Sequence, residues 1–299
     1  MSALRFAPLV ALALVSGAFA AAPKTREMHD DTGASVRVPV DNCRIVSLAP
    51  GTTAMLFAAG AGHCLVGTIA HSKEPAEAEK IPVVGDAETL DFENLLALRP
   101  TVVVVAVDVV QRVRIDRIRE LGIPVYEVHV TSLGQMPASI RALGALTNTP
   151  AVANREAVRL DERLAAIAAR YRERAPVRVL YQIWDQPIYT IGGKHVINDA
   201  LTLCGASNIF ADLSTAAPAV TREAAVLRNP DLILVSAPPA PAEEWRAAWA
   251  RFPTLNAVRN GRVLPYTDER MDRMGPLVVE ATAGLCELID HARAAPAAP

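Results

Sequence analysis

The chain has 299 residues, of which 51% are hydrophobic and 21% are charged, a balance typical of a globular protein long enough to form two lobes. Its net charge of −2 at pH 7 lacks the strongly basic character of proteins that bind nucleic acids or anionic membranes. We therefore expect neither of these as a partner.

The first 20 residues, MSALRFAPLVALALVSGAFA, have the pattern of a secretory signal peptide. Arg5 gives a positive start, residues 6–15 form an apolar run, and small residues at 18 and 20 mark a cleavage site. The run is shorter than the roughly 20 residues that span a bilayer. No cysteine follows it closely, so we expect a soluble, exported protein without a lipid anchor.

Residues 23–149 are predicted to form an N-terminal α/β lobe. Residues 28–40 have the pattern of a β-hairpin with a Thr-Gly turn. Strands are expected at RIVSLA, LVGTIA, VVVVAV and IPVYEVHV, and helical segments alternate with them. Such alternation is typical of a parallel sheet flanked by helices.

Residues 150–176 are predicted to form one long helix between the lobes. Pro150 suits the first helical turn, and the roughly 25 residues that follow contain no glycine and repeat apolar positions at helical spacing. Such a helix would extend about 37 Å. The alternative is an ordinary packed helix. The length of this helix and its position between the lobes favour a rigid connection, which predicts only a small closure of the lobes on ligand binding.

Residues 177–299 are predicted to form a C-terminal α/β lobe. Strands are expected at VRVLYQI, DLILV and RVLPY, and a closing helix is expected from Pro276. The predicted fold class is therefore α/β: two lobes, each with a mostly parallel sheet flanked by helices, are joined by one backbone helix and enclose a ligand cleft.

A pattern of helix and buried strand occurs twice, as DFENLLALRPTVVVV at 91–105 and as TREAAVLRNPDLILV at 221–235. Each copy begins with a residue type that caps helices, and Glu93 and Glu223 each precede the proline of their copy by seven residues. One interpretation is that these acids only stabilise the helix start, which is worth about 0.3–1 kcal/mol. The repeat itself also suggests one equivalent acid on each lobe.

Four cysteines in an exported protein are candidates for disulfide bonds, and three pairings are available to them. Cys43 and Cys64 each precede a predicted strand, and parallel neighbouring strands would bring them together. Cys204 and Cys286 lie on two predicted helices. We predict the bridges Cys43–Cys64 and Cys204–Cys286, each worth about 2–4 kcal/mol.

The ordered series RIVSLAPGTTAMLFAAGAG, LVGT, DFENLLALRPTVVVV, YTIGGKHVINDALTLCGASNIFADL and APAVTREAAVLRNPDLILV resembles the periplasmic binding proteins of ABC importers for cobalamin, haem and ferric siderophores. It is most similar to the cobalamin-binding branch. The resemblance implies that Glu93 and Glu223 contact arginines on the two subunits of an ABC permease dimer at the inner membrane. It also implies a Cys204–Cys286 bridge, a periplasmic monomer, and a corrinoid or iron-chelate ligand.

The ligand is expected beyond the carboxyl ends of the strands, where ligands bind in open α/β sheets. The candidates at these ends are Pro50, Gly51, Thr52, His71, Asp86 and Ala87 from the first lobe and Trp184, Gln186, Tyr189, Ala217, Tyr266, Arg270 and Arg273 from the second. Trp184 and Tyr189 suit stacking on a macrocycle or catechol, with core packing as the alternative. Arg270 beside Tyr266 suits an anionic ferric chelate, with a solvated loop as the alternative.

The resemblance leaves the identity of the ligand open. Ala87 and Ala217 stand where the best-known cobalamin binder has tryptophans, which implies a wider pocket or another chelate. Asp86 stands near a position where haem binders often have tyrosine, so His71 is the candidate axial ligand for haem. Arg270 and Arg273 are the candidates for a siderophore.

No resident cofactor or metal centre is expected, although the transported ligand is expected to contain cobalt or iron. His71, His129 and His195 are scattered at no metal-ligand spacing. The chain also lacks the GxGxxG, GxSxG, GxxxxGK[ST], HExxH and CxxC motifs. We therefore expect a binding protein without catalytic residues, rather than an exported α/β enzyme.

Overall fold

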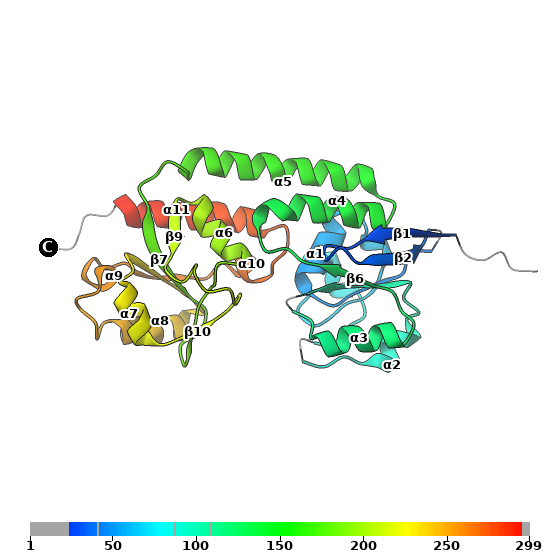
Figure 1. The fold of residues 1–299 in the computed structure, drawn as a ribbon, viewed down its shortest axis with the longest axis horizontal. Helices are drawn as coiled ribbons and strands as arrows, with labels where there is room; N and C mark the ends of the chain where they lie inside the picture. Colours follow the sequence, from blue (N-terminus) through cyan, green and yellow to red (C-terminus); the bar gives the residue numbers. More distant parts are fainter. Residues whose placement is uncertain (1–23, 41, 87, 108, 295–299) are drawn as a thin grey trace, which may run out of the picture.

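The computed structural model describes residues 24–294 except 41, 87 and 108 (Figure 1). The predicted signal peptide and Ala87 lie outside these residues. The described chain forms two halves, each built on a parallel four-stranded sheet with helices around it. The predicted α/β fold class is confirmed. Across the described residues, no helix is both long enough and apolar enough to cross a bilayer.

The N-terminal half begins with an antiparallel hairpin and continues into a sheet of order β4-β3-β5-β6. Its strands are β1 (Thr25–His29), β2 (Ser35–Pro39), β3 (Ile45–Ser47), β4 (Leu65–Gly67), β5 (Val102–Ala106) and β6 (Val125–Val128). Its α-helices are α1 (Pro50–Ala58), α2 (Phe92–Ala97), α3 (Arg112–Glu120) and α4 (Met136–Leu146), and its short 3-10 helices are η1 (Gly62–Cys64), η2 (Ala76–Lys80) and η3 (Leu133–Gln135). The valine run of β5 is buried, as expected for a strand covered on both faces.

The C-terminal half has a parallel sheet of order β12-β11-β7-β9 and a small antiparallel ribbon of β8 with β10. Its strands are β7 (Val177–Gln182), β8 (Ile188–Tyr189), β9 (Ala206–Asn208), β10 (Ala219–Val220), β11 (Leu232–Ser236) and β12 (Val263–Tyr266). Its helices are α6 (Val196–Leu203), α7 (Arg222–Arg228), α8 (Pro239–Trp249), α9 (Asn256–Arg259), α10 (Glu269–Asp272) and α11 (Val278–Ala294).

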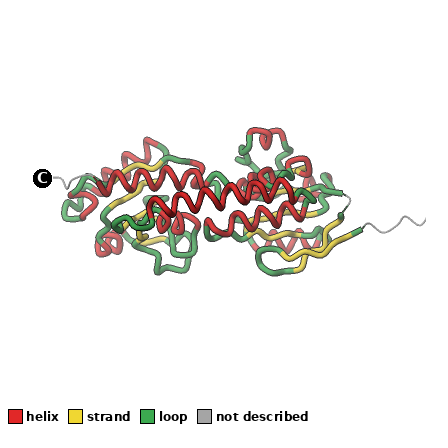
Figure 2. The backbone as a smooth tube through the Cα atoms, turned by 90° about the horizontal axis from the view of Figure 1, so that it is seen from above, coloured by secondary structure: helices red, strands yellow, loops and turns green. Residues whose placement is uncertain are grey.

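Helix α5 (Pro150–Tyr171) lies over both halves, as the view from above also shows (Figure 2). Its 22 residues extend about 33 Å, and it begins at the proline that predicted its start. Arg159 and Arg163 lie 3.1 and 3.0 Å from the Glu280 carboxylate on α11, while Arg141 on α4 lies 2.7 Å from Asp161 on α5. The helix is therefore fixed to both halves. The domain limits 23–149, 150–176 and 177–299 stay predictions.

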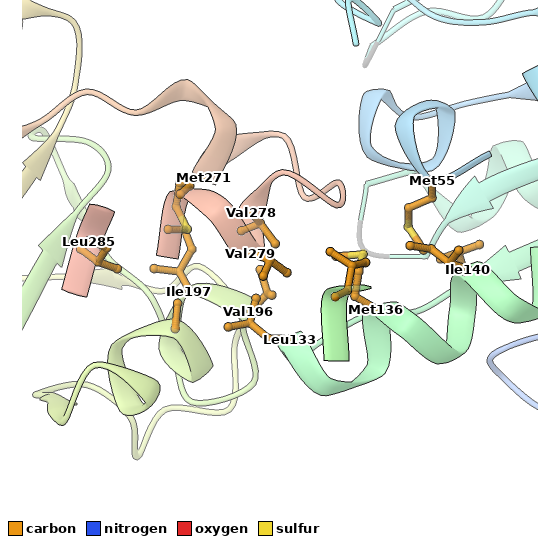
Figure 3. Packing of buried hydrophobic residues seen from close by; sticks show 14 of the residues in the cluster. Met55, Leu133, Met136, Ile140, Val196, Ile197, Met271, Val278, Val279 and Leu285 are labelled. Atoms are coloured by element: carbon orange, nitrogen blue, oxygen red, sulfur yellow. The ribbon is translucent and has the colours of Figure 1, made fainter. Parts of the chain in front are cut away.

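One apolar core passes from one half into the other beneath α5. Leu133 and Met136, from the N-terminal half, belong to the same buried cluster as Val196 and Val279 of the C-terminal half. Figure 3 shows Leu133 close to the two valines. The halves therefore share buried apolar surface in addition to the long helix.

Both predicted disulfide bonds are present. Ile45 of β3 pairs with Leu65 of β4 in a parallel register, and this brings Cys43 and Cys64 to a Cα–Cα distance of 5.1 Å. Cys204, at the end of α6, is bonded to Cys286 of α11 with a Cα–Cα distance of 4.7 Å. The second bridge fixes α6 to the helix on which α5 also packs.

Candidate ligand-binding cleft

A pocket of about 500 Å³ lies between the two halves. The N-terminal half lines it with residues 49–52, 55, 71, 73, 106, 107, 109, 128, 130 and 131, and the C-terminal half with residues 194–196, 216, 217, 269 and 272–274. The segments after β3, β5 and β6 meet here because the carboxyl ends of parallel strands share one edge of the sheet. The pocket is therefore where the strand order predicts a ligand.

The wall formed by the start of α1 is held by buried hydroxyl groups. The Thr53 hydroxyl donates to the Ala49 carbonyl at 3.0 Å and lies 3.0 Å from the Thr68 hydroxyl, while the Ser47 and Thr52 hydroxyls are 2.7 Å apart. These bonds join β3, α1 and the segment after β4. They give the lining residues 49–52 a fixed position.

Gly51 allows the two halves to touch at one wall of the pocket. A Cβ atom built on Gly51 would lie 2.6 Å from the Arg273 carbonyl oxygen and 2.8 Å from that of Met274. Real Cβ atoms do not approach backbone so closely, so a side chain here would push the halves apart. The adjoining Met274 has a φ of 52°, in the left-handed region that non-glycine residues rarely adopt.

Charged groups gather on the C-terminal side of the pocket. Arg273 lies 2.9 Å from Glu74 of the other half and 2.8 Å from Glu269, so it forms an ion pair across the cleft. Partial burial, together with the nearby Glu269 and Asp268 carboxylates, raises the pKa of Asp272 to about 6, although its side chain keeps contact with solvent. The Asp272 carboxyl therefore loses its proton closer to neutral pH than an ordinary aspartate does.

Two histidines line the pocket, one from each half. His71 is exposed and has a φ of 67°, an unusual backbone conformation at the mouth of the pocket. His195 caps α6, because its Nδ1 accepts a hydrogen bond from the Ile197 N–H at 3.2 Å. Within the described part of the chain, no three His, Cys, Asp or Glu side chains gather as they would around a metal ion.

Six of the predicted cleft residues line the pocket: Pro50, Gly51, Thr52, His71, Ala217 and Arg273. Asp86 lies outside the lining and instead closes its own turn, where hydrogen bonds from the Thr89 and Glu88 N–H groups at 2.6 and 2.8 Å lower its pKa. Arg270 also lies outside and is paired with Asp268 two residues away, at 2.6 Å.

Tyr266 is a core residue, which corrects the expectation that it faces the cleft. It is 7% exposed, its hydroxyl donates to the Ala281 carbonyl at 3.3 Å, and its ring packs edge-on against Tyr181. Strand β12 ends at Tyr266 with the side chain directed inward, since successive strand residues point to opposite faces.

Trp184, Gln186 and Tyr189 also lie outside the pocket lining. Trp184 is 57% exposed, and its ring packs edge-on against that of Trp245 with a centroid distance of 5.8 Å. Tyr189 forms an isolated antiparallel β-bridge with Trp184. Trp184 was expected to face the ligand cleft; it is exposed, but it does not line this pocket. Its predicted role in stacking on a ligand stays a prediction.

Sequence reasoning missed most of the polar lining, including Lys73, Lys194, His195 and Asp272. Candidates were sought directly beyond the carboxyl ends of the strands. Lys73 follows β4 in the same segment as His71, so extending this strand-end rule by two residues would have found it. Lys194 and His195 stand directly before α6. A search at the starts of helices, rather than at the ends of strands, would have found these two residues.

The repeated acids lie one in each half. Asp91 and Thr221 cap α2 and α7 as predicted, accepting hydrogen bonds from the N–H groups three residues later at 2.9 and 3.1 Å. Glu93 is exposed on α2 and Glu223 is exposed on α7. Both helices lie on the side of the molecule away from α5 (Figure 1).

Comparison with known proteins finds a family and relatives that match most of this chain. The sequence profile of the periplasmic binding protein family matches residues 45–269. Vitamin B12-binding proteins of Vibrio cholerae serotype O1 are 29% identical over 251 residues, which is 84% of this chain and 90% of theirs. Those of Yersinia pestis are 29% identical over 244 residues, which is 82% of this chain and 85% of theirs.

Solved structures agree in fold. The periplasmic vitamin B12 binding protein BtuF of Vibrio cholerae superposes with a TM-score of 0.76 and 28% identity, covering 84% of this chain and 98% of that one. The periplasmic heme-binding protein RhuT from Roseiflexus sp. RS-1 gives a TM-score of 0.71 at 23% identity, covering 84% and 99%.

Proposed function

Since the chain belongs to the periplasmic binding protein family, we propose that it captures cobalamin or a related corrinoid or metal chelate and delivers it to an ABC permease in the inner membrane. It is a binding protein and not an enzyme, as the family is. The observation that carries the proposal is a pocket of about 500 Å³ between two parallel sheets, in a fold shared along nearly the full length of vitamin B12-binding relatives.

The lining suits a large chelate with an apolar face. Its apolar members include Met55, Val107, Val130, Val196 and Met274. Binding sites for such ligands are commonly apolar with a few polar groups that fix orientation. Most of the charged side chains of the lining are exposed, so the edge of a macrocycle would meet them.

Haem is the second candidate, because His71 lines the pocket and imidazole is a common axial ligand of haem iron. Equilibrium titration of the purified protein with cobalamin, haem and a panel of ferric siderophores, followed by calorimetry, tests both candidates. We expect one molecule of corrinoid to bind per chain. If only haem binds, and the absorption spectrum of protein-bound haem is lost in His71→Ala, the second candidate replaces the first.

We propose further that Glu93 and Glu223 dock the loaded protein, as a monomer, on the two subunits of the permease. Support comes from their neighbours: Leu96 and Leu227, one helical turn after the acids, are 44% and 88% exposed. An exposed apolar side chain beside an acid on each half gives two similar contact patches. A two-fold symmetric partner would fit such a pair.

Glu93→Lys/Glu223→Lys tests the docking. We expect uptake to be lost while the affinity for ligand in solution stays unchanged, because neither acid belongs to the pocket lining. A control with Glu162→Lys and Glu244→Lys reverses two other exposed acids, on α5 and α8, and should transport normally. A parallel fall in affinity would show that these glutamates act on the cleft instead.

The site of action follows from the same proposal. We infer that the chain works in the periplasm after export directed by residues 1–20, without a lipid anchor. Cell fractionation of the full-length chain, with N-terminal sequencing of the released protein, checks this. Recovery of the uncleaved chain in the cytoplasm would contradict it.

A further inference from the structure

Two lysines, one from each half, line the same pocket. Lys73 comes from the segment after β4, and Lys194 stands just before α6. Both side chains are exposed, so they lie at the mouth rather than at the apolar floor. Only four of the chain's 30 basic residues are lysines, and two of those four are here.

The other charges of the lining do not neutralise these lysines by ion pairs. Arg273 is engaged by Glu74 and Glu269 at 2.9 and 2.8 Å. Asp272 is the remaining acid of the lining. Among the residues that the structure describes, neither Lys73 nor Lys194 forms an ion pair with an acid. Two cations therefore face the pocket with their charge available to a ligand.

We propose that Lys73 and Lys194 make the cleft selective for a chelate that carries anionic oxygen groups, carboxylate or phosphate, on its periphery. This inference rests on the proposed function of the cleft and names the class of ligand. Lysine is suited to this task because its ammonium group is a compact charge with three donors on a flexible stem. It reaches an anionic group without the fixed planar geometry that arginine requires.

The apolar part of the lining strengthens this selectivity. Valine and methionine side chains line the same pocket, so a bound ligand would displace water from it, and attraction between charges grows as the local dielectric constant falls. A ligand with only neutral amides at its edge would leave the ammonium groups without partners. A ligand with acidic groups would pair with one lysine from each half.

Three corrinoids separate these cases. Dicyanocobinamide has amide side chains and no phosphate, cobalamin adds one phosphate in its nucleotide loop, and cobyrinic acid carries carboxylates in place of the amides. We expect the wild-type protein to bind cobyrinic acid most tightly and dicyanocobinamide least tightly. Raising the salt concentration from about 0.05 to about 0.5 M should weaken binding of cobyrinic acid much more than binding of dicyanocobinamide.

The lysine variants give the decisive comparison. Lys73→Gln and Lys194→Gln should each lower the affinity for cobyrinic acid about tenfold and change that for dicyanocobinamide less than twofold. Lys73→Arg and Lys194→Arg should keep most of the preference, because the charge is retained. Lys80→Gln, which removes an exposed lysine outside the pocket, is the matched control and should behave as wild type.

The outcomes separate the inference from the proposed function. Equal affinities for the three corrinoids, with no effect of either glutamine variant, would overturn the inference and leave corrinoid binding intact. If no corrinoid binds, the corrinoid candidate of the proposed function fails, and haem and its dimethyl ester then test the lysines on a macrocycle with and without free carboxylates. Equal binding of those two, or binding of neither, would overturn the inference.

Discussion

The two disulfide bonds should stabilise the fold to different degrees, because they close chain segments of different length. Cys204 and Cys286 are 82 residues apart, whereas Cys43 and Cys64 are 21 apart. A cross-link restricts the unfolded chain more when the closed loop is longer. The chain-entropy relation gives about 4.5 kcal/mol for the longer loop and about 3.3 kcal/mol for the shorter one.

Replacing each pair by alanine therefore predicts an ordered loss of stability. We expect Cys204→Ala/Cys286→Ala to lower the free energy of unfolding by about 1 kcal/mol more than Cys43→Ala/Cys64→Ala does. Both variants delete two sulfur atoms, so most of the side-chain contribution cancels in the comparison. Urea unfolding at equilibrium under oxidising conditions, followed by circular dichroism, measures the difference.

The longer bridge should also matter for binding. Lys194 and His195 stand directly before α6, and Cys204 fixes the end of that helix to α11. We expect ligand affinity to fall in the variant without this bridge and to change little in the other. If losing the 43–64 bridge costs as much stability or more, the loop-length reasoning is wrong for this protein.

Three further predictions concern the cleft. The pKa of Asp272 is raised to about 6 from an ordinary 3.8, so the folded state loses stability as the pH rises through this window. Asp272→Asn should therefore be more stable than wild type at pH 7, by on the order of 1 kcal/mol or less because solvent screens the group. In urea titrations this gain should become small near pH 4 and vanish below pH 3.8. Gly51→Ala should lower the free energy of unfolding by about 1–3 kcal/mol and weaken ligand binding, because the new Cβ would meet the Arg273 carbonyl. An unchanged melting temperature and an unchanged ligand affinity in calorimetry would show that the two halves move apart there at little cost. X-ray scattering profiles of the free and ligand-bound protein should be nearly identical because α5 and the shared core couple the halves, and a large change on binding would refute this.

The sequence predicted best what depends on neighbours along the chain. The caps Asp91 and Thr221, the buried run of β5 and the proline start of α5 all follow from local patterns. The strand-end rule likewise found Pro50 and its neighbours, because it needs only the direction of a strand. These features do not depend on how distant segments pack.

The strand-end rule failed where the direction of a strand residue, or an ion pair with a neighbouring residue, determines whether a side chain reaches the pocket. Tyr266 ends its strand but points into the core, and the residue count alone does not reveal which face is inward. Arg270 follows β12 on the short helix α10 as the strand order suggests, yet it forms an ion pair with Asp268 instead of lining the pocket. Lys73 and Lys194 face one pocket only because two segments more than a hundred residues apart meet, which no local pattern records.

The apolar cluster that joins Leu133 and Met136 to Val196 and Val279 determines how the molecule should melt. Loss of packing in one half would expose apolar side chains of the cluster in the other half, so we expect heating to give a single cooperative transition although the ribbon shows two sheets (Figure 1). A ligand held between the halves would then raise the melting temperature of the whole chain. At a free concentration one hundred times its Kd, it would add about 2.7 kcal/mol to the stability.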